Sequence, residues 1–174
     1  KAAARAVETL ISLGHKKIAV IGGQRQYSDI CAMRWQGVLD ALGAHGLTIE
    51  PELDYATVYF SPEGGCTGAT ELLRRGREFT ALFTMSDLIS IGAFRALKDR
   101  GLEVPGDVSV IGFDGLPVGE YLVPRLTTVD QPTAAMAQRG LQMLLDAIEH
   151  NAEARHEAVP FTLLYRESTG KVRG

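Results

Sequence analysis

Short apolar runs alternate with helical patterns along the first two thirds of the chain, and this alternation restricts the fold more than any other feature. Apolar runs typical of strands occupy residues 17–22, 55–60, 80–85 and 107–113. Segments with the three- and four-residue spacing of helices lie between them, at residues 28–43, 61–75 and 87–100. Strands that alternate with helices of this length form βαβ units. The sequence therefore predicts an α/β fold with a doubly wound parallel sheet, covered by helices on both faces.

Apolar spacing also predicts which face of each helix is buried. On the helix at 28–43 the spacing places Ile30 and Met33 inward. On the helix at 87–100 it places Leu88, Ile91, Phe94 and Leu97 inward. We expect these faces to pack on the sheet.

The regular alternation ends after residue 115. A loop with two prolines follows, then a short strand at 127–130, a long helix at 133–150 and a last strand within 159–168, after which a frayed tail is expected. The chain begins with another helical pattern, at 1–13, which has neither an initiator Met nor an N-cap. We therefore expect this chain to be a piece of a longer protein.

Side chains that can bind a ligand follow the ends of the predicted strands. Ligands bind to open parallel sheets beyond the carboxyl ends of the strands. Past these ends come Arg34, Phe60, Ser86 with its neighbour Asp87, and Asp114. Charged groups make strong hydrogen bonds to hydroxyls, and an aromatic ring can cover a C–H face. The sequence predicts a site for a sugar-like or other small polar molecule.

Composition and motifs argue against several other classes. The 18 Lys and Arg are scattered among 21 Asp and Glu, with a net charge of -3, so these residues predict no nucleic-acid surface. No apolar run is long enough for a bilayer, and no membrane partner is predicted. Cys31 and Cys66 form no motif and suit a reducing compartment. The sequence offers no nucleophile with a base, no metal-ligand spacing and no cofactor loop, so we predict no enzyme, no metal and no cofactor.

Four motifs, in this order, resemble the regulatory domain of lactose-repressor/galactose-repressor (LacI/GalR) transcription factors. They are "LISLGHKKIAVIGG", "RWQGVLDAL", "SDLISIGAFRALKDRGLEVPGDVSVIGFDG" and "PRLTTVDQP", and the resemblance runs from about residue 1 to residue 169. It implies a type I periplasmic-binding-protein-like fold, in which two Rossmann-like lobes enclose an effector cleft. One Rossmann-like lobe would be complete here, with remnants of the second.

The resemblance also implies how the chain is divided. Residues 1–14 would be a remnant helix of the N-terminal lobe and 15–131 the C-terminal lobe. Residues 132–157 would hold the return helix to the N-terminal lobe, and 158–174 the C-terminal strand and tail. The helices at 1–13 and 133–150 would then lack the sheet they cover, so we expect their apolar faces to pack on each other or on a second chain.

Effector-binding positions follow from the same resemblance. Arg34 matches the arginine of an "R-x-x-G" motif, and Asp114 is the carboxylate that ends "V-I-G-F-D". Phe60 falls at the aromatic position that covers the effector, while Ser28 and Gln131 fall at polar contact positions. Ser86 departs from the Asn that many relatives have there, and its shorter side chain favours a lost or water-mediated contact.

The resemblance implies a bacterial, cytoplasmic transcription regulator whose domain binds an effector, most often a sugar in this family, and couples it to DNA binding. DNA would be bound only by a headpiece N-terminal to Lys1. A homodimer is expected, with apolar interface candidates at Ile91, Phe94, Leu116, Tyr121 and Leu122. The alternative is a periplasmic sugar-binding protein for transport or chemotaxis, and a flavodoxin-like enzyme is a weaker third hypothesis.

Overall fold

A mixed sheet lies at the centre of the structure, which is a computed structural model that describes residues 1–76, 78–150, 153 and 155–173. The strand order in these residues is β2-β1-β3-β4-β5-β6. The strands are β1 (Ile18–Gly22), β2 (Tyr55–Thr57), β3 (Ala81–Thr84), β4 (Ser109–Asp114), β5 (Thr127–Asp130) and β6 (Thr162–Leu164). Strands β1 to β5 pair in parallel, and β6 is antiparallel to β5. The predicted α/β fold is confirmed, and an antiparallel edge strand is added to it.

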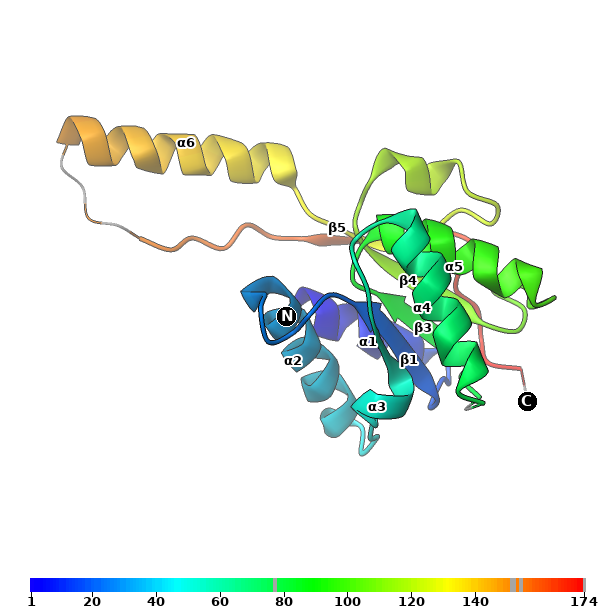
Figure 1. Cartoon of the computed structure of the whole chain (residues 1–174). Coiled ribbons are helices and arrows are strands. Elements are labelled where there is room, and N and C mark those ends of the chain that lie inside the picture. The colour runs from blue at the N-terminus through cyan, green and yellow to red at the C-terminus, as the bar shows by residue number, and fades with distance from the viewer. Residues whose placement is uncertain (77, 151–152, 154, 174) are drawn as a thin grey trace.

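Helices cover both faces of this sheet (Figure 1). On one face lie α1 (Ala2–Ser12) and α2 (Asp29–Ala44), and on the other lie α4 (Pro62–Arg74) and α5 (Asp87–Asp99). Neighbouring residues of one strand enter different cores: Val20 packs with the first pair of helices, and Ile21 with the second. This alternation explains why the strands are apolar throughout, as expected of a sheet covered on both sides. The short helices α3 (Pro51–Asp54) and η1 (Pro117–Glu120) lie in connecting segments.

Glycines bring α4 and α5 into close contact. A Cβ atom on Gly92 would lie 1.7 Å from the carbonyl oxygen of Pro62, and one on Gly65 would lie 2.0 Å from that of Ile89. The backbones of the two helices therefore touch where side chains would otherwise separate them.

Close packing between α4 and α5 also corrects the predicted helix faces. Leu97 is buried as predicted, whereas Leu88, Ile91 and Phe94 are only partly buried. The rest of the buried face of α5 includes Ile89, Ala93 and Ala96. Small residues on α5 face its neighbour because the close approach leaves no room for larger ones.

The face predicted for α2 is also wrong at its first turn. Ile30 is 55% exposed and Met33 is 66% exposed, while the buried face is formed by Cys31, Trp35 and Val38. Ile30 instead borders a hollow that is described below.

The first helix packs on the sheet of this lobe. Val7 and Leu10 are fully buried in the core that also contains Val20 of β1 and Phe83 of β3. The expectation that this helix belongs to another lobe, and must pair with the later helix or a second chain, is therefore wrong. Residues 1–14 cover the same sheet as α2.

Helix α6 (Thr133–His150) behaves differently. It leaves the end of β5 and extends away from the layered body, with the following segment running back beside it (Figure 1). None of its residues is buried, and Leu141, Leu144 and Ile148 are each more than half exposed. Its apolar face is unpartnered in the single chain, so the expected packing against helix 1–13 is not found, and packing on a second chain stays a prediction. Residues 151, 152 and 154 of the predicted segment 132–157, and residue 174 of the predicted tail, lie outside the described residues.

The C-terminal tail is packed and not frayed, contrary to the expectation. Ser168, at the start of the tail, is fully buried, and its Oγ donates to the carbonyl of Val110 at 2.6 Å and accepts from the amide of Thr127 at 2.8 Å. Within the tail itself, the amide of Val172 donates to the carbonyl of Leu13 at 3.1 Å. The buried ring of His15 lies 3.0 Å from the carbonyl oxygen of Gly170. These bonds tie the tail to β4, to β5 and to the turn before β1, which satisfies polar groups that sequence periodicity does not reveal.

Candidate functional site

Asp114 stands at the end of β4 and accepts hydrogen bonds from three other predicted site residues. Its Oδ2 accepts from Ser86 Oγ at 2.8 Å. Its Oδ1 accepts from Gln131 Nε2 at 2.8 Å and from Arg34 Nη2 at 3.2 Å. We name Arg34, Ser86, Asp114 and Gln131 the Asp114 cluster. Four side chains predicted separately from the sequence thus meet at the carboxyl ends of β3, β4 and β5.

Arg34 is the cation of this cluster, and it is held on several sides. Its side chain is 12% exposed, and its guanidinium carbon lies 3.9 Å from the centre of the Phe113 ring. Its Nη1 donates to the carbonyl oxygen of Met85. Burial lowers the pKa of this guanidinium, and the Asp114 carboxylate opposes that shift. Arg34 is therefore a fixed donor whose charge is balanced by Asp114.

Asp114 has an unusual backbone conformation, with a φ of 117°. Apart from glycines, it has the only positive φ among the described residues. Such a conformation costs of the order of 1 kcal/mol or more for a residue with a Cβ, and is retained where the surroundings require it. A turn alone would be more stable with glycine at this position. The carboxylate therefore points to a function beyond ending the strand.

A hollow of about 520 Å³ lies beside the cluster, beyond the ends of β1 and β2. We name it the aromatic hollow. Its lining residues are Gly23, Gln24, Tyr27, Ser28, Ile30, Cys31, Thr57, Val58, Tyr59 and Phe60. The two remaining predicted effector residues, Ser28 and Phe60, are both among them. Ser28 also caps α2, and its Oγ accepts from the amide of Cys31 at 3.4 Å.

Sequence reasoning missed three large side chains of the aromatic hollow. Tyr27, Ile30 and Tyr59 are 81%, 55% and 86% exposed. The strand predicted for 55–60 ends at Thr57, so Tyr59 and Phe60 lie in the loop that follows β2. Aromatic residues next to a strand end were the available signal, because a loop seldom leaves such residues in water without a partner.

The Asp114 cluster and the aromatic hollow are adjacent. Arg34 lies one helical turn after Ile30 and Cys31, and residues at this spacing are neighbours on a helix surface. The carbonyl that Arg34 binds belongs to Met85, whose sulfur lies 3.8 Å from the Tyr55 hydroxyl. That hydroxyl donates to the carbonyl of Gly23, in the wall of the hollow, at 2.6 Å. The cluster, with its charged hydrogen-bonding groups, and the hollow, with its aromatic rings, are therefore neighbours that buried contacts connect.

Comparison with known proteins decides which family this arrangement belongs to. Residues 7–169 match the model of the periplasmic binding protein-like domain family. The chain belongs to this family. The periplasmic-binding-protein-like fold, which the sequence supported only through a resemblance, is thereby confirmed.

Similar proteins are transcription regulators. The ribose operon repressor of Haemophilus influenzae is 34% identical over 164 residues, which are 94% of this chain and 49% of that protein. A LacI-family regulator from Enterococcus faecium, solved with bound ribose, is 30% identical with a TM-score of 0.87 over 98% of this chain and 63% of that one. The lac repressor dimer bound to operator is 27% identical with a TM-score of 0.90, over 97% of this chain and 57% of that one. The LacI/GalR resemblance is confirmed, and the chain spans about half the length of the curated relatives it matches.

In this periplasmic binding protein-like domain, Asp87 has a structural position next to the cluster. Its side chain is fully buried, and Oδ1 accepts from Thr128 Oγ1 at 2.6 Å while Oδ2 accepts from the amide of Leu116 at 2.6 Å. Burial raises its pKa to about 6, against the effect of these bonds. Asp87 thus ties the start of α5 to the loop that follows Asp114.

Ionisation of Asp87 gives the stability of the domain a distinct pH dependence. Because its folded pKa of about 6 exceeds the unfolded value of 3.8, its contribution is greatest below about pH 4 and is lost as the pH rises through about 6. The total is of the order of 3 kcal/mol, of which roughly 1 kcal/mol falls between pH 5 and pH 8. Asp87→Asn removes this contribution. As the pH rises from 5 to 8, the free energy of unfolding of the variant, measured with urea, should therefore increase by about 1 kcal/mol relative to wild type. Parallel pH profiles would contradict the assignment.

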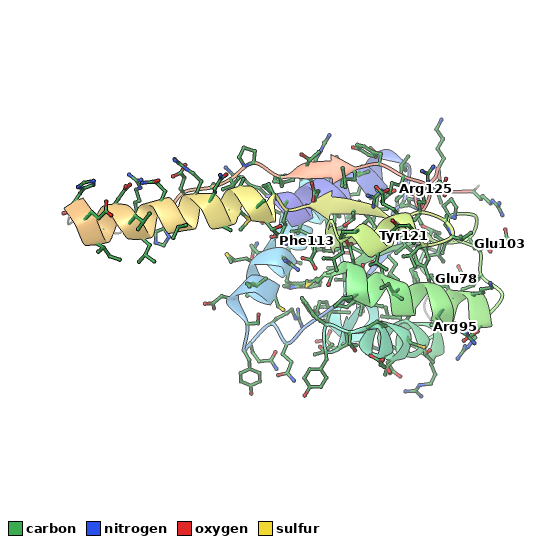
Figure 2. All side chains as sticks on the ribbon, turned by 90° about the horizontal axis from the view of Figure 1, so that it is seen from above. Glu78, Arg95, Glu103, Phe113, Tyr121 and Arg125 are labelled. Atoms are coloured by element: carbon green, nitrogen blue, oxygen red, sulfur yellow. The ribbon has the colours of Figure 1, made fainter. Side chains whose placement is uncertain are left out.

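The predicted interface residues of the domain lie on α5 and around η1. Tyr121 is 84% exposed, and Figure 2 shows it on the layered body, between Phe113 and Glu103. Ile91, Phe94, Leu116 and Leu122 are partly buried. Phe94 and Leu122 also line a hollow of about 390 Å³ beside Val123, which is 94% exposed. Dimer contact through this surface stays a prediction.

No metal centre is found in the described part of this domain, where no three His, Cys, Asp or Glu side chains come together as ligands. Within the same residues, no helix is long and apolar enough to cross a membrane.

Proposed function

We propose that this domain is the effector-binding and dimerisation part of a LacI-type transcription regulator that responds to a sugar. The Asp114 cluster is the observation that carries the proposal, because it presents a carboxylate, a guanidinium, a hydroxyl and an amide at the carboxyl ends of the sheet. Arg34, Ser86, Asp114 and Gln131 would bind the sugar hydroxyls, and Ser28 and Phe60 would contact it from the hollow. The ribose-bound relative supports a sugar as the effector.

Gln131 provides a route from the site to the rest of the protein. Its Nε2 donates to Asp114 Oδ1, and its backbone stands two residues before α6 begins. A ligand that takes over the Asp114 carboxylate would change the contacts of this connection. If α6 covers a companion lobe, as its exposed apolar face suggests, the sugar would shift the population of lobe angles and so alter DNA affinity.

Several further assignments belong to the same proposal. Residues 15–131, together with α1, would form one lobe, and residues 132–157 would return to the other. The protein would act in the cytoplasm as a homodimer without enzymatic activity, a cofactor or a membrane partner. DNA would be bound by a headpiece outside this chain. The dimer contact would use Ile91, Phe94, Leu116, Tyr121 and Leu122.

A DNA-binding assay separates this proposal from the alternative of a periplasmic sugar carrier. The full-length protein should bind DNA from upstream of its own gene. A panel of sugars, added in turn, should include one that changes the DNA affinity about tenfold, since coupling between two sites is commonly 5- to 150-fold. Fluorescence anisotropy of labelled DNA measures this change. Tight sugar binding without any DNA binding would instead favour transport or chemotaxis.

A further inference from the structure

We propose that the effector is a neutral glycoside of at least two rings. The hydroxyls of one ring would be bound by the Asp114 cluster, and the second ring would occupy the aromatic hollow. This inference rests on the proposed function and specifies the chemical class of the ligand.

Size is the first argument for a second ring. None of the four residues of the Asp114 cluster lines the aromatic hollow, so the two parts of the surface are adjacent but separate. The hollow alone measures about 520 Å³, which is within the range of complete small-molecule sites. A monosaccharide bound by Asp114 would reach the hollow only at Ser28 and Phe60, and would leave the rings of Tyr27 and Tyr59 without a ligand. A ligand that fills both parts needs a second ring.

The walls of the hollow fit the faces of a ring. Tyr27 comes from the loop after β1, and Tyr59 and Phe60 come from the loop after β2. Their exposed rings, together with Ile30, offer apolar faces for the C–H groups of a sugar or for an aryl group. The tyrosine hydroxyls, Ser28 Oγ and the amide of Gln24 supply uncharged hydrogen-bonding groups. This lining suits a ring with few charges and several hydroxyls.

Charge is the argument for a neutral ligand. The lining of the hollow contains no Lys, Arg, Asp or Glu. Arg34 is neutralised by Asp114. Arg25, in the loop after β1, is held over the rings of Trp35 and Tyr55, with distances of 4.6 and 4.5 Å to their centres. The N-terminus of α2 already has Asp29 in its first turn, which complements its positive end. A phosphate or carboxylate in the hollow would therefore meet no cation among the lining residues.

Calorimetric titration of the full-length protein tests the class of ligand. The probes are maltose, cellobiose, lactose and phenyl β-glucoside as neutral two-ring ligands, with glucose and glucose 6-phosphate as comparisons. We expect at least one two-ring ligand to bind at least about tenfold more tightly than glucose and glucose 6-phosphate, from the added aromatic contacts. The double variant Tyr27→Ala/Tyr59→Ala should remove this advantage and leave glucose affinity unchanged.

Tyr165→Ala is the matched control, because Tyr165 is a 62% exposed tyrosine outside the lining. It should bind every probe as wild type does. The inference is overturned if glucose 6-phosphate binds most tightly, if glucose equals the two-ring ligands, if the double variant keeps the advantage, or if no two-ring probe binds. The variant Asp114→Ala distinguishes a failure of the two-ring inference from a failure of the proposed function. Glucose or glucose 6-phosphate binding that is lost in Asp114→Ala supports the site while rejecting the second ring, and sugar binding that survives Asp114→Ala rejects the site itself.

Discussion

Asp114→Ala should weaken binding of the effector sugar at least about 100-fold, because two hydrogen bonds from sugar hydroxyls to a carboxylate contribute about 1.5–3 kcal/mol each. The same change leaves Arg34 buried without its counter-ion, which adds an unfavourable charge to the empty site. Titration calorimetry on the full-length protein with the tightest-binding sugar measures the loss.

Two further variants show that this effect comes from the carboxylate and not from misfolding. Asp114→Gly should lose binding equally while the folded state relaxes at this residue, since its φ of 117° suits glycine. Asp99→Ala should bind sugar as wild type does, because the Asp99 carboxylate pairs with Arg95 on the exposed side of α5. Wild-type affinity in Asp114→Gly would show that the carboxylate has no part in binding.

Gly92→Val should destabilise the domain by about 3 kcal/mol or more, as expected for overpacking against backbone that cannot move aside. A Cβ at this position would lie 1.7 Å from the carbonyl oxygen of Pro62 and 2.4 Å from the amide nitrogen of Cys66. Both atoms belong to the first turns of α4, so α4 and α5 would have to separate. Urea unfolding followed by far-UV circular dichroism measures the loss.

Gly43→Ala is the matched control, because a Cβ at this helical glycine meets no atom within 4 Å. Its stability should equal or slightly exceed that of wild type, as alanine favours a helix over glycine. Equal effects of the two substitutions would mean that the close contact between α4 and α5 is not what requires glycine at position 92.

Element types could be predicted from the sequence because each strand carries its own apolar run between helical patterns. Val20 and Ile21 are neighbours that enter different cores, so both faces of the strand are buried. A strand buried on both faces is apolar throughout and is therefore easy to recognise in a sequence. Helix faces were harder to predict. Gly65 and Gly92 bring two helices so close that small residues face the contact, and a count of large apolar residues misses this.

Packing between distant segments could not be predicted. The family resemblance places helix 1–13 in another lobe, and its amphipathic pattern does not specify which sheet it covers. The structure shows Val7 and Leu10 in the core of this sheet. The tail was expected to fray because it has no periodicity. It is held instead by the hydrogen bonds of Ser168 and His15, which join residues far apart in the chain.

The candidate site was partly predictable. Strand ends in a parallel sheet meet at one edge, so Ser86 and Asp114 could be placed together from the order of the strands. The hollow beside them could not be predicted, because its shape depends on the residue at which β2 ends and on the conformation of the loops that hold Tyr27 and Tyr59.

A crystal structure of the full-length protein with its tightest-binding sugar tests the central claim most directly. We predict sugar hydroxyls within 3.2 Å of the Asp114 carboxylate and of Arg34, a range typical of hydrogen bonds. A sugar bound elsewhere, with Asp114 still hydrogen-bonded to Arg34, Ser86 and Gln131, would contradict the assignment of this cluster as the effector site.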